Sequence, residues 1–108
     1  MRLGIVIGTV TLNRWHESLA GGKWRLVTPL SWADLSRLPQ GETDNLQAFA
    51  SDLATEPLTA YDEIHAGVGS LVAFTEGREA SSPFHPDVKP VDAYVTAILD
   101  QLNVTKFE

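Results

Sequence analysis

The sequence predicts a mainly-β fold, a small barrel of about five short strands, and three observations support this class. Residues 3–12 form an apolar stretch interrupted by glycines, and two further apolar runs flank a Gly-x-Gly turn at residues 67–69. Short apolar runs bounded by glycine turns are typical of strands. The chain has 108 residues, which is enough for one modest hydrophobic core. We therefore expect residues 1–108 to form a single domain.

The composition limits the classes of partner. The formal net charge is −6, and an acidic surface repels phosphate backbones, so nucleic acid is not expected as a partner. The absence of cysteine excludes a disulfide framework and a thiolate metal site, and it fits a reducing cytoplasm. The first residues lack the pattern of a signal peptide, and no apolar run is long enough to span a membrane. We therefore expect a cytoplasmic protein without a membrane partner.

The first predicted strand, residues 3–12, is apolar or small on both faces. Strands of that kind are usually covered on both sides. One cover is then the core, and the other is a neighbouring subunit that the glycines allow to approach closely. The alternative is that the glycines only permit the strong curvature of a barrel strand. One face carries Leu3, Ile5 and Ile7, and the other carries Gly4, Val6, Gly8 and Val10.

A second strand and a partly helical insertion follow. Residues 23–30 read as a strand antiparallel to the first. Residues 31–57 read as an insertion on the surface, because Ser31 and Asp34 resemble a helix capping box. A second short helix, with Asp44 as its N-cap, is predicted by an apolar stripe at helical spacing. The stripe consists of Leu46, Phe49, Ala50 and Leu53.

The turn that contains Gly67 and Gly69 links two apolar runs, residues 58–64 and 70–75. We expect these runs to be adjacent strands joined by a tight loop. Glycine is placed where φ is positive or where another backbone comes close, so the turn is either a hairpin detail or a packing point against another chain. A phosphate-binding Gly-x-Gly-x-x-Gly loop is not expected, because Val72 occupies the position of the third glycine.

The last predicted element is a helix from Pro90 to about Asn103. Proline suits the first turn of a helix, and apolar residues recur at helical spacing behind it. Together, the predicted elements are those of a small five-stranded OB-like Greek-key barrel with a C-terminal helix. The predicted buried stripe of the helix is Val91, Tyr94, Val95, Ile98 and Leu102.

No residue pattern predicts an enzyme. The spacing of His16, His65 and His85 matches no metal-ligand pattern, and the serines lie in no nucleophile motif. Asp62 and Glu63 are adjacent in a predicted strand, so they point to opposite faces and cannot form a close acid–base pair. We therefore expect no catalytic residues, no metal site and no cofactor.

Four stretches, taken together and in order, resemble the CcmL/EutN family, the pentameric vertex proteins of bacterial microcompartments such as carboxysomes. The opening strand and the Ser-Leu-x-Gly-x-Lys motif before the second strand are two of them. The others are the turn with Gly67 and Gly69 and the Pro-Val-Asp-Ala motif with its Ile-Leu-Asp end. Two departures stand out: residues 77–81 differ from the Gly-Ser-Ser-Ala-Arg of many relatives, and residues 31–56 are longer than in compact members. The four stretches are residues 1–10, 18–27, 60–72 and 89–100.

The resemblance implies a structural protein, not an enzyme, that forms homopentamers and caps the five-fold vertices of a microcompartment shell. It also implies hexameric or pseudohexameric shell proteins as partners. The alternative is an OB-like binding module for oligonucleotide or oligosaccharide, since exposed aromatic side chains could stack on bases. Such aromatics include Trp15, Trp24, Trp32 and Phe84, but only a few basic residues, Arg14, Lys23 and Arg25, lie beside them in an acidic chain. The residues expected at the subunit interface or ring turn are Gly4, Val6, Gly8, Val10, Ala66, Gly67, Val68 and Gly69.

Overall fold

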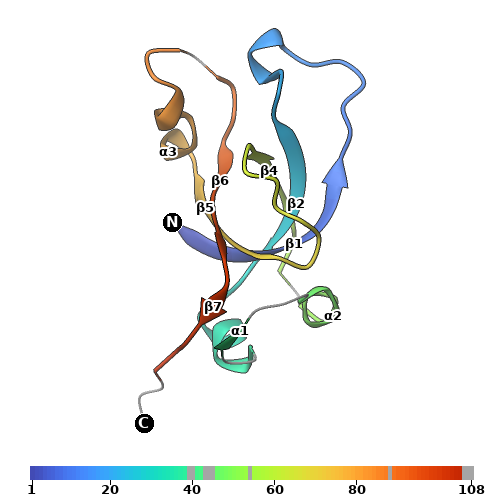
Figure 1. Cartoon of the computed structure of the whole chain (residues 1–108), viewed down its shortest axis with the longest axis vertical. Helices are drawn as coiled ribbons and strands as arrows, with labels where there is room; N and C mark the ends of the chain where they lie inside the picture. The colour runs from blue at the N-terminus through green and yellow to red at the C-terminus, as the bar shows by residue number, and fades with distance from the viewer. Residues whose placement is uncertain (39–40, 43–45, 54, 88, 106–108) are drawn as a thin grey trace.

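Five strands close into a barrel in the computed structural model, in the order β1-β2-β4-β6-β5, with β5 returning to β1 (Figure 1). All neighbours are antiparallel except β4 and β6, which run parallel where Tyr61 pairs with Tyr94. The predicted mainly-β, five-stranded barrel is confirmed. The structure describes residues 1–38, 41–42, 46–53, 55–87 and 89–105. The strands are β1 (Arg2–Val10), β2 (Lys23–Pro29), β4 (Leu58–Asp62), β5 (Leu71–Glu76) and β6 (Ala93–Leu99).

The shorter elements gather at the two ends of the barrel. Figure 1 shows α1, α2 and β7 at the lower end, and α3 and the long β1–β2 loop at the upper end. This arrangement elongates the molecule to 48 × 26 × 23 Å. The short helices are η1 (Glu17–Leu19), α1 (Trp32–Arg37), α2 (Gln47–Ala50), α3 (Arg78–Ser81) and η2 (Ser82–Phe84), and β3 (Gly41–Glu42) pairs with β7 (Gln101–Leu102).

The predicted C-terminal helix is wrong. The segment forms β6 and β7 instead, and β6 completes the barrel by pairing with β4 on one side and β5 on the other. Its side chains do alternate, with Ala93 and Val95 buried. Apolar residues also occupy outward positions, among them Tyr94 and Ile98, and these produced the helical spacing. In a short apolar segment, the spacing of apolar residues can fit both a helix and a strand. Here the segment becomes a strand because two neighbouring strands supply its hydrogen bonds.

The strands β4 and β5 are not neighbours in the sheet, so the predicted hairpin is also wrong. The strand β6 lies between them, and the turn that joins β4 to β5 crosses the end of the barrel toward β1. Strand order of this kind depends on pairing between segments far apart in the sequence. It gives the barrel its Greek-key character.

The first strand is buried on both faces at its centre, over Gly4, Ile5 and Val6. The second cover at Ile5 differs from the two that were expected. Val6 faces the barrel interior, together with Val27, Val72 and Phe74. Ile5 belongs to a second apolar cluster, in which Leu38 and Leu46 come from the insertion. The second cover of β1 at Ile5 is therefore the chain's own insertion.

The insertion is partly helical, as predicted. Ser31 Oγ accepts a hydrogen bond from Asp34 N at 3.2 Å, and Asp34 Oδ2 accepts one from Ser31 N at 2.9 Å, which completes the capping box of α1. The predicted N-cap Asp44 lies outside the described residues. Ala50 is the buried residue of α2, and Phe49 and Leu53 are partly buried against the same cluster.

Candidate subunit interface

A buried carboxylate shapes the turn that follows β4. Asp62 is fully buried, and its Oδ2 accepts hydrogen bonds from Arg25 Nε at 2.9 Å and from Ala66 N at 2.8 Å. Its Oδ1 accepts a third from Ile64 N at 3.0 Å. All of these bonds are charge-assisted, so they fix the path of the turn more firmly than neutral bonds would. Asp62 is therefore a structural residue, and sequence reasoning missed this role.

Gly69, not Gly67, is the conformationally special glycine of the turn. Gly69 has a φ of +91°, whereas the φ of Gly67 lies outside the left-handed region. The backbone of Gly69 donates to Val6 O at 2.7 Å and accepts from Leu46 N at 2.8 Å. Val6 N in turn donates to Ser70 O at 3.0 Å. The turn therefore extends the hydrogen bonding of β1 and anchors the insertion at the same point.

The eight residues predicted for the interface divide by burial. Gly4, Val6, Ala66 and Gly69 are buried within the single chain, so they contribute little to its surface. Gly8 and Val10 are half-buried, Gly67 is exposed, and Val68 is 45% exposed. The interface role of the accessible members stays a prediction. Val10 lies where β1 enters the long β1–β2 loop, and Val68 lies in the β4–β5 turn.

The aromatic residues at the upper end of the barrel pack against one another. The ring of Tyr61 lies 5.3 Å from Trp24 and 5.9 Å from Phe84, centroid to centroid, both in edge-on contacts. Lys89 Nζ lies 4.4 Å from the Phe84 centroid and 5.0 Å from that of Tyr61. These edge-on and cation–π geometries stabilise the upper core. Trp24 and Phe84 are thus engaged inside the molecule, which weakens the base-stacking alternative.

Tyr94 closes the side of this aromatic cluster. Its hydroxyl donates a hydrogen bond to Glu63 Oε1 at 2.8 Å. Burial, followed by the hydrogen bond to Glu63 and the negative charge of that carboxylate, raises the pKa of Tyr94 to about 12. Glu63 is exposed while its neighbour Asp62 is buried. The two carboxylates therefore have different partners and act on different parts of the fold.

The comparisons with known proteins identify the family of this barrel. The family model described as ethanolamine utilisation protein EutN/carboxysome matches residues 1–100. The chain belongs to the EutN/CcmL family. Its sequence is 30% identical over 104 residues to the carboxysome shell vertex protein CcmL of Gloeobacter violaceus, covering 96% of this chain and 87% of the relative.

Solved structures of EutN/CcmL proteins superpose on nearly the whole chain. GrpN, a pentameric microcompartment shell protein from Rhodospirillum rubrum, is 28% identical with a TM-score of 0.69, covering 97% of this chain and 100% of GrpN. EutN from Escherichia coli is 25% identical with a TM-score of 0.69, covering 96% of this chain and 89% of EutN. The resemblance predicted from the sequence is confirmed.

The departure from the EutN/CcmL pattern at residues 77–81 has a defined structure here. Gly77 has a φ of +67° and donates its N–H to Asp92 O at 2.8 Å, and the short helix α3 starts directly after it. Ala80 on this helix is buried in the cluster of Tyr61. The altered loop therefore contributes a helix that covers the upper core.

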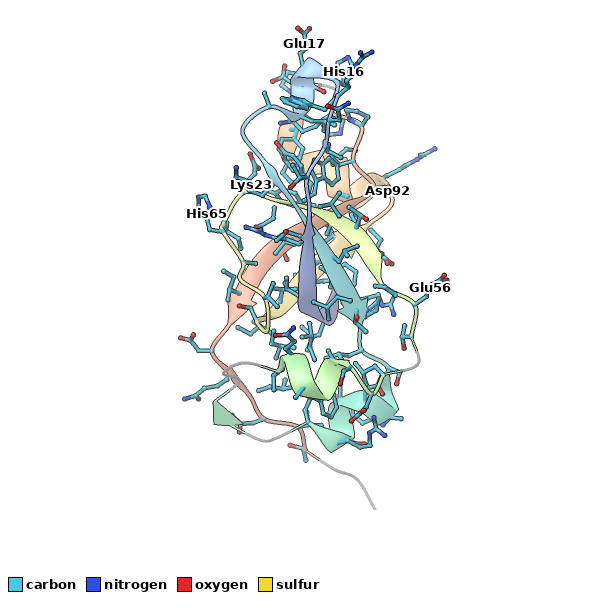
Figure 2. All side chains as sticks on the ribbon, turned by 90° about the vertical axis from the view of Figure 1, so that its right-hand side faces the viewer. His16, Glu17, Lys23, Glu56, His65 and Asp92 are labelled. Carbon is cyan, nitrogen blue, oxygen red and sulfur yellow. The ribbon has the colours of Figure 1, made fainter. Side chains whose placement is uncertain are left out.

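The described residues contain no cluster of three potential metal ligands. His16 and His65 are exposed and lie on different parts of the molecule (Figure 2). Within the described part of the chain, no helix is long and apolar enough to cross a membrane. A structural role, predicted from the sequence in place of an enzymatic one, agrees with membership of the EutN/CcmL family.

Proposed function

We propose that this chain is a structural protein whose pentamers cap the five-fold vertices of a bacterial microcompartment shell. The observation that carries this function is the match of residues 1–100 to the EutN/CcmL family. Two relatives support the role by their descriptions, because one is a shell vertex protein and another is a pentameric shell protein. The protein would then reside in the microcompartment shell within the cytoplasm.

The accessible surface area of the isolated chain is larger than that of a typical monomer, which supports its assembly into an oligomer. The accessible surface is 6843 Å² for a mass of 11.8 kDa. A monomeric protein of that mass exposes ~5,900 Å² on average, so the surplus is roughly 900 Å². One partner in a standard protein–protein interface buries about 800 Å², so the surplus is comparable to one such surface.

The partners follow from the geometry of a closed shell. Flat hexagonal tiles cover a plane, and five-fold units supply the curvature that closes it. Hexameric or pseudohexameric shell proteins are therefore the neighbours of a pentameric vertex. Within a ring, each chain meets the next head to tail, and a closed rotation prevents an open filament. The insertion at residues 31–57 is a candidate for selecting the neighbouring tile.

Native mass spectrometry of the purified chain tests the oligomeric state, and we expect a pentamer. A monomer as the main species at micromolar concentration would contradict the proposed function. Tight binding of single-stranded nucleic acid by that monomer would favour the OB-like binding module instead.

Deletion in a cell that makes the full shell tests the vertex role itself. Strains without this protein and any paralogue should form sheets of hexameric tiles but open or misshapen shells. Normally closed and sealed shells in such a strain would rule out the vertex assignment.

A further inference from the structure

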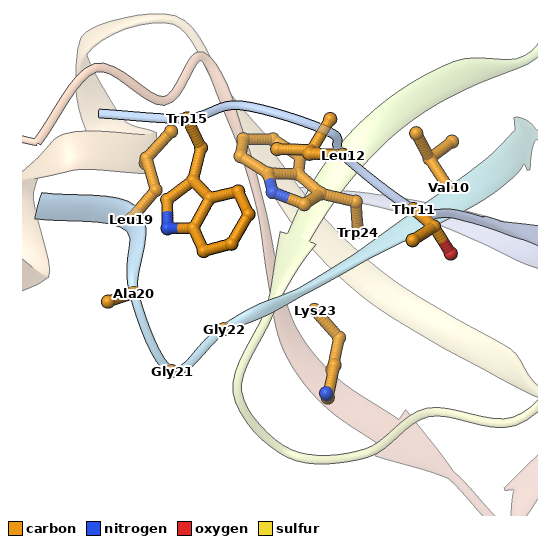
Figure 3. A pocket seen from close by; sticks show the side chains of 10 residues that line it. All are labelled: Val10, Thr11, Leu12, Trp15, Leu19, Ala20, Gly21, Gly22, Lys23 and Trp24. Atoms are coloured by element: carbon orange, nitrogen blue, oxygen red, sulfur yellow. The ribbon is translucent and has the colours of Figure 1, made fainter. Parts of the chain in front are cut away.

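The long β1–β2 loop forms an open cavity at the upper end of the molecule, with a lining that is partly apolar and partly polar. We call this cavity the tip socket and define it by Val10, Leu12, Trp15, Leu19 and Trp24. Its volume is about 290 Å³. Figure 3 shows the Trp24 ring beside Leu12 and the Trp15 ring beside Leu19, while the Lys23 side chain extends away from the rings. Trp15 is 55% exposed, so much of its ring meets solvent in the isolated chain.

The chain builds this cavity with a loop held in place by specific contacts. Ser18 N donates to His16 Nδ1 at 3.1 Å, which caps the short helix η1. Tyr61 Oη donates to Leu19 O at 3.4 Å, which ties the loop to the upper core. A Cβ on Gly22 would overlap the Tyr61 ring, so glycine is needed for this close approach. These contacts hold the side of the socket from Leu19 to Gly22 against the upper core.

We propose that the tip socket is the site at which a second copy of this chain docks in the ring, an inference that rests on the proposed pentameric function. The socket holds two tryptophans, and Trp15 is half-exposed. Tryptophan is enriched among the interface residues that dominate binding, so this surface is well suited to a contact between subunits. In a head-to-tail ring, every chain presents two different surfaces, and the socket is one of them. The surplus of roughly 900 Å² in surface area is of the size that one such contact buries.

A small-molecule ligand fits the socket less well than a second copy. Ligand sites combine an apolar wall with a few converging polar groups that fix the ligand's orientation. The socket's charged lining residue, Lys23, is exposed, and its side chain extends away from the indole rings in Figure 3. The volume lies at the lower end of the range of ~300–1,000 Å³ that is usual for ligand pockets.

Trp32 provides a matched comparison on the same chain. It is 66% exposed, slightly more than Trp15, and lies on α1 at the opposite end of the molecule (Figure 1). It does not line the socket. Single exposed apolar residues are normal on protein surfaces, so exposure alone does not predict an interface for Trp32. The two tryptophans should therefore respond differently to assembly.

The first experiment compares Trp15→Glu with Trp32→Glu by native mass spectrometry and sedimentation across a range of concentrations. We expect Trp32→Glu to remain pentameric like the wild type. The Trp15→Glu pentamer should dissociate at a protein concentration at least tenfold higher than that at which the wild-type pentamer dissociates, or the variant should be monomeric throughout. A Trp15→Glu pentamer that is as stable as that of Trp32→Glu would overturn the inference. A wild-type chain that is not pentameric would instead overturn the proposed function on which the inference rests.

A second experiment avoids any effect of the charge on folding. Two variants keep one exposed tryptophan each: Trp24→Phe/Trp32→Phe retains Trp15, and Trp15→Phe/Trp24→Phe retains Trp32. Acrylamide quenching of the two pentamers should be several-fold weaker for Trp15 than for Trp32, although their exposure in the single chain is similar. Equal quenching in the pentamers would show that Trp15 stays in solvent and would exclude the socket from the interface.

Discussion

Arg25 and Asp62 form an ion pair across β2 and β4, with 2.9 Å between Arg25 Nε and Asp62 Oδ2. The carboxylate is fully buried, and the guanidinium side chain is largely buried. Two backbone N–H groups of the following turn share the same carboxylate. The pair therefore links the barrel wall to the turn that leads into β5 and contacts β1.

Removing the buried charge at Asp62 should be strongly destabilising. Asp62→Ala would leave Arg25 without its partner and two backbone donors without an acceptor. Breaking a buried ion pair from one side costs about 3–5 kcal/mol, which lowers the melting temperature of a small domain by more than ~10 °C. Thermal unfolding followed by circular dichroism measures this. The control is Glu63→Gln, an exposed neighbour that keeps an acceptor for Tyr94, and similar melting temperatures for both variants would contradict the role of Asp62.

The two glycines of the β4–β5 turn should differ in their tolerance of a side chain. Gly69→Val should cost about 1–3 kcal/mol, because a β-branched residue would be held at a positive φ. Gly67→Val should change stability by less than ~0.5 kcal/mol, because a Cβ there meets only Ser70 Oγ, at 3.9 Å. Chemical denaturation of both variants gives the comparison. Equal losses would show that the strain is not specific to Gly69.

Four of the five observed barrel strands, β1, β2, β4 and β5, coincide with runs predicted as strands, because alternation and glycine turns are local signals. It could not give the position of β6 between β4 and β5, since that order depends on pairing between distant segments. The helix predicted over β6 arose because Tyr94 and Ile98 are apolar on the outward face. A local pattern cannot show that two neighbouring strands will supply the hydrogen bonds.

The candidate site was predictable only in part. The turn at residues 67–69 was predictable, but φ is not visible in a sequence, so the pattern could not show that Gly69, and not Gly67, has a positive φ. The structural role of Asp62 could not be predicted, because the sequence does not show which of the adjacent acids Asp62 and Glu63 is buried. Trp15 and Trp24 come together only through the path of the β1–β2 loop.

The insertion should contribute to stability through Phe49. This side chain is half-buried in the outer cluster, and its ring centroid lies 5.7 Å from Arg37 Cζ. Phe49→Ala should cost about 2 kcal/mol, less than the ~3–5 kcal/mol that follows full burial. Equilibrium unfolding in urea measures the change, with Gln47→Ala on the exposed part of α2 as the control. An unchanged free energy of unfolding for Phe49→Ala would mean that the insertion does not stabilise the barrel.

Alkaline pH should destabilise the barrel through Tyr94. Its pKa is raised from 10.0 to about 12 in the folded chain by burial and by Glu63. Below pH 10 the tyrosine is protonated in both folded and unfolded chains, so the full contribution to stability is present. Between pH 10 and about 12 the unfolded chain releases the proton first, so stability falls as the pH rises through this window.

Tyr94→Phe removes the hydroxyl and should therefore lose less stability between pH 9.5 and 11.5 than the wild type does. Thermal unfolding of both proteins at a series of pH values makes the comparison, and every contribution that the two proteins share cancels. If the two melting temperatures fall in parallel across the window, the Tyr94–Glu63 hydrogen bond does not couple folding to pH.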